Sequence, residues 1–193
     1  MNYNELARQL HEAAEKRGFW DVDDALCKHI AKMISEVGEV IQEDRCGTPT
    51  LYVDDISTPG PITDINAFDG RKPEGVAAEM ADYVMMMLDL LHVLVTDIDN
   101  YMGLFPFEAY RSDYYDKIVN STAYDTAILM AQSVCDLVTN DADELNKAAI
   151  AAVIVSCYHV RLWLEVRGYD LFEIIRLKMA YNESRPALHG RKY

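Results

Sequence analysis

Two pairs of acidic residues lie inside apolar stretches that otherwise have the pattern of helices. Glu36 and Glu39 form the first pair, and Glu79 and Asp82 form the second. Residues at positions i and i+3 share one face of a helix, with Cβ atoms about 5–6 Å apart. If the two helices pack side by side, four carboxyl groups converge. The pairs therefore constrain both the packing of the chain and the chemistry that it can support.

Apolar residues flank both pairs closely, which argues against a simple solvated face. Acids at the edge of a core are costly unless something compensates their charge. Two like charges about 4 Å apart repel by roughly 4 kcal/mol at an effective dielectric constant of about 20. Four such carboxylates would hold protons or cations, and all-oxygen ligands select Mg²⁺ or Mn²⁺ over zinc or copper. Glu43 and Asp89 each follow a pair member by seven residues, so each is either an outer ligand or a solvated acid.

Helix-forming residues dominate the chain and strand-like alternation is scarce. We expect an all-α fold, an antiparallel bundle of about six helices in a single domain spanning residues 1–193. Residues 46–75 hold four of the six prolines and predict a long loop, with a short hairpin around 51–53, while Gly103 and Pro106 indicate a turn-rich stretch. The expected helices cover residues 4–17, 24–45 and 74–99, then run from a cap at Asn120 or Ser121 to 139, from a cap at Asp141 or Asp143 to 167, and from 170 to 185.

Charge and composition exclude several classes of partner. The formal net charge of -14 makes nucleic acid a poor partner for most of the surface. No apolar run is expected to reach the roughly 18 to 20 residues that cross a membrane, and the charged, amphipathic N-terminus is not a signal peptide. The four cysteines form no CxxC pair, which is typical of reduced thiols, so we expect a cytoplasmic protein.

The last 18 residues are basic in an otherwise acidic chain. They hold five of the 18 lysines and arginines. Lys178, Asn182 and Arg185 fall on one stripe of the last expected helix, and Arg191 and Lys192 follow it. Such a cationic stripe either suits phosphate oxygens or simply complements the C-terminal end of a helix dipole. Together with a metal site, it makes a triphosphate the most economical ligand.

Four motifs bring these features together: GFWDVDD, ISEVGEVIQEDR, KPEGVAAEMADYVMMMLDL and KMAYNESRPALHGRKY. In combination they resemble the MazG-like all-α nucleoside triphosphate pyrophosphohydrolases, a group related to dimeric dUTPases and dCTP pyrophosphatases. The resemblance covers about residues 4–92 and 158–193. It implies cleavage of a nucleoside triphosphate between its α and β phosphates, in nucleotide-pool housekeeping, by a homodimer or homotetramer.

The resemblance also implies roles for individual residues. Glu36, Glu39, Glu79 and Asp82 would hold Mg²⁺, with Mn²⁺ as a possible substitute. A carboxylate of Glu36, Glu39 or Glu43 would orient the attacking water. Trp20 would stack on the base, with Phe19 as a second candidate, although a hydrophobic staple between helices is the alternative for Trp20. The remaining substrate contacts would come from Lys178, Asn182, Arg185, Arg191 and Lys192.

The chain departs from the family pattern through about 65 residues that precede the last helix. We expect a helical insertion at about 100–165. SVCDLV echoes EVGEVI, and YHVRLWL echoes LHVLVTD, so the insertion is a candidate degenerate copy of the acidic hairpin that takes a partner subunit's place. A di-iron bundle is disfavoured because no Glu-x-x-His is present. The alternative function is a catalytically inactive, helical nucleotide- or metal-binding regulatory protein.

Overall fold

Eight helices make up most of the computed structural model in the residues it describes, which are 2–20, 25–53, 70–139 and 147–184. Two strands of two residues each, β1 (Tyr52–Val53) and β2 (Pro73–Glu74), pair antiparallel. The expected all-α bundle is therefore confirmed. The helices are α1 (Tyr3–Lys16), α2 (Ala25–Cys46), α3 (Val76–Leu94), α4 (Ile98–Leu104), α5 (Phe107–Val119), α6 (Ala123–Thr139), α7 (Lys147–Glu165) and α8 (Leu171–Glu183).

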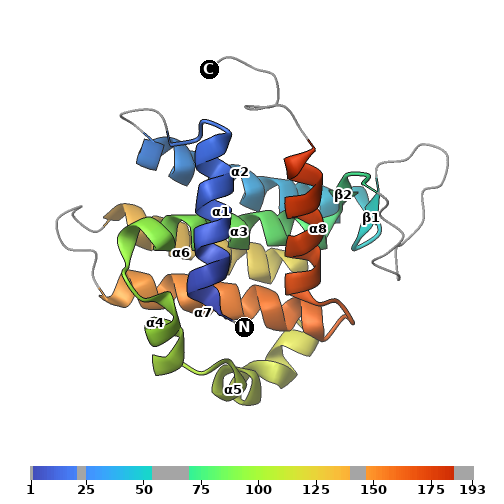
Figure 1. Ribbon diagram of the computed structural model, residues 1–193. Helices are drawn as coiled ribbons and strands as arrows, with labels where there is room; N and C mark the ends of the chain where they lie inside the picture. The colour runs from blue at the N-terminus through green and yellow to red at the C-terminus, as the bar shows by residue number, and fades with distance from the viewer. Residues whose placement is uncertain (1, 21–24, 54–69, 140–146, 185–193) are drawn as a thin grey trace.

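The central helix of the bundle is α3. Fourteen of its 19 residues are buried, which is expected of a helix that is apolar on nearly all sides. It packs against α2 and α7, while α6 packs against both of these, so the four helices form a bundle. The helices α1 and α8 also contact α3 and run across the bundle in Figure 1. Because neighbours cover α3 from several directions, its acidic residues lie at helix interfaces.

The small β ladder fixes the point where α3 begins. Tyr52 pairs with Glu74, and the backbone N–H of Ala77 donates to the carbonyl oxygen of Thr50 at 2.9 Å. Gly75 lies between the ladder and the helix with a φ of 101°. A Cβ atom at this position would lie 2.7 Å from the carbonyl oxygen of Pro49, so only glycine fits. This junction fixes where α3 begins and therefore fixes the position of Glu79, which lies one turn into the helix.

The structure contains two helices that the sequence did not indicate, within the stretch expected to be turns. Val95 is extended and ends the third helix at Leu94, whereas the expected end was residue 99. Asp97 then caps α4 by accepting a hydrogen bond from the Asn100 N–H at 3.0 Å. Pro106 precedes α5 with a φ of −59°. Proline is tolerated at a helix start, so Pro106 begins a helix instead of marking a turn.

The α6–α7 hairpin packs against the α2–α3 hairpin through a buried polar contact. The hydroxyl group of Tyr83 on α3 lies 3.2 Å from the carbonyl oxygen of Met130 and 2.5 Å from the Ser133 hydroxyl, both on α6. It also lies 3.0 Å from the Ser156 hydroxyl on α7. One phenol group therefore joins three helices. Whether the second hairpin is a degenerate copy of the first stays a prediction.

Among the described helices, α7 is the one long and apolar enough to cross a membrane. Within the structure 61% of its apolar window is buried, because α7 packs against α3, α5, α6 and α8. Its burial is consistent with the core helix of a soluble protein. The sequence expectation that no apolar run reaches this length is therefore corrected for α7.

We expect Tyr83→Phe to lower the free energy of unfolding by about 1–2 kcal/mol, because it removes a buried hydroxyl group shared by three partners. Equilibrium urea denaturation measures the change. Tyr124→Phe is the matched control, since Tyr124 is 40% exposed on α6, and its effect should stay within about 0.5 kcal/mol. Equal effects of the two substitutions would contradict a stabilising role for the Tyr83 contact.

Candidate metal centre and adjoining cleft

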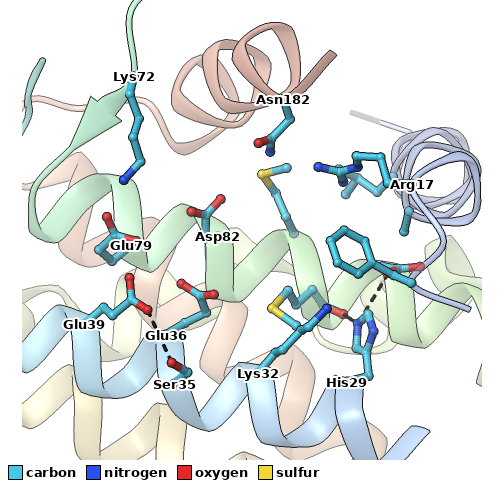
Figure 2. Close-up of a pocket in the computed structure, with 16 residues that line it drawn as sticks. Arg17, His29, Lys32, Ser35, Glu36, Glu39, Lys72, Glu79, Asp82 and Asn182 are labelled. Carbon is cyan, nitrogen blue, oxygen red and sulfur yellow. Dashed lines mark hydrogen bonds and ion pairs between the residues drawn. The ribbon is translucent and has the colours of Figure 1, made fainter. Parts of the chain in front are cut away.

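The two acidic pairs face each other across the α2–α3 interface. The helices run antiparallel, and the His29 side chain of α2 lies 3.1 Å from the carbonyl oxygen of Met86 on α3. Further along the same interface, carboxylate oxygens of Glu36, Glu39 and Glu79 all lie within 4.8 Å of one another. Figure 2 shows these side chains converging from the two helices. The expected convergence of the two pairs is thus present, and three of the four acids form a compact oxygen cluster.

Asp82, the fourth acid, is held by a buried lysine from α8. Its Oδ2 atom lies 2.5 Å from Lys178 Nζ, and Glu79 Oε2 lies 3.8 Å from the same nitrogen. The Lys178 side chain is only 3% exposed. Burial lowers the pKa of Lys178, but the two acids outweigh this and raise it above its ordinary value, which favours the charged ammonium form. In this structure Lys178 therefore contacts the acidic cluster, and Asn182, one turn later, lines the neighbouring cleft.

One buried ammonium group does not balance four carboxyl groups. Burial raises the pKa of Glu36 to about 9, and the neighbouring Asp82, Glu39 and Glu79 add to this effect. Burial likewise raises the pKa of Glu79 to about 8, although Lys178 opposes the shift. In the absence of another cation, part of this cluster holds protons at neutral pH. The arrangement therefore favours the binding of further positive charge.

A cleft of about 340 Å³ opens beside the four acids. Lys72, near the end of the proline-rich segment, lies above the acids in Figure 2, while Arg17 and Lys32 lie at the other end of the cleft. Lys72 forms an ion pair with Glu74. Burial and the neighbouring Arg17 guanidinium lower the pKa of Lys32 from its usual value. An acidic end and a basic end thus share one cavity.

Of the two aromatic residues expected to meet the base, Phe19 lines this cleft and Trp20 does not. Phe19 lines the cavity, and the ammonium nitrogen of Lys32 lies 3.5 Å from the centroid of its ring. Trp20 is not among the described residues that line the cleft. Its ring stacks on His29 at a centroid distance of 4.8 Å, so it packs behind the cavity wall. The packing of Trp20 matches the alternative of a contact between helices.

Asp89 anchors the wall behind Phe19. This buried carboxylate lies 3.2 Å from Trp20 Nε1, measured to either of its oxygens, and 2.7 Å from His11 Nδ1. His29 Nε2 lies 3.4 Å from its second oxygen. Asp89 is therefore neither a solvated acid nor part of the compact oxygen cluster. It holds α1, α2 and α3 together at the end of the cleft that Phe19 lines.

Glu43 lies apart from the cluster. Its Oε2 atom accepts hydrogen bonds from the hydroxyl groups of Thr48 at 2.6 Å and Tyr52 at 3.2 Å. Glu43 is not among the described residues that line the cleft. Its contacts instead stabilise the segment between α2 and β1. The expected substrate contacts Arg185, Arg191 and Lys192 lie outside the described residues.

Sequence reasoning missed three cations of the cleft. Arg17 is the cap residue that ends α1, Lys32 lies one turn before Glu36, and Lys72 immediately precedes β2. The spacing of Lys32 and Glu36, at i and i+4, was a signal that could have placed Lys32 beside the acids. For Arg17 and Lys72 the sequence carries no comparable signal, because each reaches the cleft through a turn or a strand pairing.

The His29 imidazole gives this wall a pH dependence. Burial lowers the pKa of His29 from its ordinary value of 6.5, although Asp89 opposes the shift. As pH falls below about 6.5, the unfolded chain takes up a proton before the folded protein does, so stability is lost. We expect the free energy of unfolding of the wild type to fall more between pH values of about 7.5 and 5.5 than that of His29→Gln.

The glutamine keeps a donor for the Met86 carbonyl oxygen but removes the titration, and urea denaturation at a series of pH values measures both proteins. Parallel stability curves would show that His29 does not titrate in this way.

Comparisons with known proteins assign no family: no family model, no curated protein and no solved structure matches the chain. The resemblance of the four sequence motifs stays a prediction. A functional assignment therefore depends on the arrangement of the described residues.

Proposed function

We propose that this protein is a Mg²⁺-dependent nucleoside triphosphate pyrophosphohydrolase, which releases a nucleoside monophosphate and pyrophosphate. The observation that carries the proposal is the convergence of two acidic pairs from α2 and α3 at one end of a cleft whose other end is basic and aromatic. A ligand that fits such a cavity is anionic, binds divalent metal ions and carries a flat ring. A nucleoside triphosphate has all three properties.

The chemistry of the donor set fits magnesium. Glu36, Glu39, Glu79 and Asp82 offer carboxylate oxygens, which hard divalent cations prefer. Lys178 would balance only part of the negative charge of four ionised carboxylates, and burial together with the neighbouring acids raises the pKa of Glu36 and Glu79. When bound, Mg²⁺ would supply the means to polarise phosphoryl oxygens and to lower the pKa of a water molecule.

The remaining side chains of the cleft would orient the substrate. Lys72 beside the acids and Arg17 at the far end bracket the cavity with positive charge, and Asn182 adds an amide group from α8. Such groups suit the oxygens of a polyphosphate chain. Glu39 is the exposed member of the oxygen cluster, and its Oε1 atom lies 3.3 Å from the Ser35 hydroxyl. This exposure makes Glu39 the better placed of the expected residues to orient an attacking water.

Phe19 is the side chain best placed to meet the base. Its ring lines the cavity opposite the acids, and stacking on an aromatic ring tolerates any base. In the structure Lys32 covers the ring through a cation–π contact. A stacked base would have to displace this ammonium group, which would then lie close to the phosphates.

A panel of nucleoside triphosphates tests the proposal directly. The protein is incubated with each triphosphate and Mg²⁺, and the products are separated. Monophosphate together with pyrophosphate supports the pyrophosphohydrolase. Release of orthophosphate would point to cleavage of a different bond. Binding of nucleotides without any product would instead favour the regulatory protein.

Glu39→Gln should reduce kcat at least about 100-fold, because loss of a direct metal ligand should cost more than loss of a residue that merely supports one. Glu39 is exposed, so the substitution should leave the fold intact, as circular dichroism would confirm. Asp44→Asn is the matched control, since Asp44 lies exposed on the same helix outside the cluster. Wild-type turnover in Glu39→Gln would refute the metal assignment.

Phe19→Ala should raise the KM for nucleoside triphosphates about tenfold or more, because base stacking on an aromatic ring contributes about 1–3 kcal/mol. Inhibition by inorganic triphosphate, which lacks a base, should change little. Phe105→Ala serves as the control, since Phe105 is 50% exposed and is not among the residues lining the cleft. Equal weakening of inorganic triphosphate and nucleotides would argue against a base contact at Phe19.

A further inference from the structure

Lys178 already occupies a cation position within the acidic cluster. Its ammonium nitrogen reaches Asp82 from α8 at 2.5 Å and approaches Glu79 at 3.8 Å. Both Lys178 and Glu79 are nearly inaccessible to solvent, so water screens their interaction poorly. Burying such a lysine costs desolvation energy, which its interactions with these acids compensate. Part of the negative charge of the four acids is therefore balanced by a lysine of the chain itself.

A divalent cation at the same carboxylates would face this ammonium group at short range. The two positive charges would share Glu79 and Asp82, and at low effective dielectric their repulsion is strong. The Lys178 side chain is enclosed and has little freedom to move away from the acids. Its charge must therefore weaken the binding of a metal ion to the protein alone.

We infer that Lys178 acts as a built-in competitor for the metal ion and so couples metal loading to the binding of a polyphosphate. The inference rests on the proposed function. A polyphosphate adds negative charge beside both cations and relieves their repulsion. Metal ion and polyphosphate would then each strengthen the binding of the other, a reciprocity that linkage requires. Free protein would bind the metal weakly, and the complete set of charges would assemble only around an anionic ligand.

Replacement of the lysine by an apolar side chain of similar length tests this inference. Lys178→Met should bind Mn²⁺, used as the probe metal in isothermal titration calorimetry without nucleotide, about tenfold or more tightly than the wild type. The thermal midpoint of the metal-free variant should fall, because Asp82 loses its partner, and added Mn²⁺ should raise it by more than in the wild type. A purely structural lysine would lower the midpoint without tightening metal binding.

Lys178→Arg is the matched control, because it keeps the charge and should keep the wild-type metal affinity. Inorganic triphosphate should increase the affinity for Mn²⁺ less in Lys178→Met than in the wild type. The Mn²⁺ that triphosphate itself chelates is subtracted in both cases. Unchanged or weaker metal binding by Lys178→Met, with clear binding by the wild type, overturns the inference and leaves the proposed function standing. No metal binding by the wild type, with or without triphosphate, overturns both.

A measurement on the wild type covers the case in which Lys178→Met fails to fold. The ammonium ¹⁵N resonance of Lys178 should shift saturably as Mg²⁺ is added, because the metal ion alters the field at Nζ. The same titration of Glu39→Gln should show a weaker response at a given concentration. A Lys178 resonance that does not respond to metal in a wild type that binds it would overturn the inference.

Discussion

The shortage of positive charge at the junction of α2, α3 and α8 is the constraint on which the site depends. Four carboxyl groups meet there, and within the described residues Lys178, which contacts Glu79 and Asp82, is the single buried lysine or arginine. Hydrophobic packing around α3 brings these groups together although their mutual repulsion opposes it. The stability of the surrounding bundle thus sustains a local arrangement that is unfavourable by itself. That local cost makes the cluster receptive to an external cation.

The cleft is assembled from segments that are distant in sequence, and each is positioned by a different device. The β ladder and Gly75 set the start of α3, so they determine where Glu79 meets α2. Asp89 ties Trp20 and His11 to the same helix and thereby holds the turn that presents Phe19. The acidic and aromatic ends of the cavity are therefore both positioned relative to α3, which sets the distance between them.

The sequence predicted the all-α class and the meeting of the two acidic pairs, because both follow from helical periodicity. It missed α4 and α5, where Asp97 and Pro106 act as helix starts although such residues also mark turns. It favoured Trp20 over Phe19, because composition does not reveal which of two neighbouring aromatic rings faces a cavity. It connected Lys178 with phosphate or with the helix dipole and not with the acids, since its burial against Asp82 depends on how α8 crosses α3. The spacing of residues within one helix does not determine which distant segments contact that helix.

Asp82 and Tyr83 are neighbours in sequence, yet they point to different sides of α3. Successive residues of an α-helix point about 100° apart, so Asp82 faces the cleft while the Tyr83 hydroxyl reaches Ser133 and Ser156 in the core. The phenol group thereby fixes the rotation of α3 about its own axis. A substitution in the α6–α7 hairpin that displaces this phenol group would consequently change the orientation of the Asp82 carboxylate, although it lies far from the cleft.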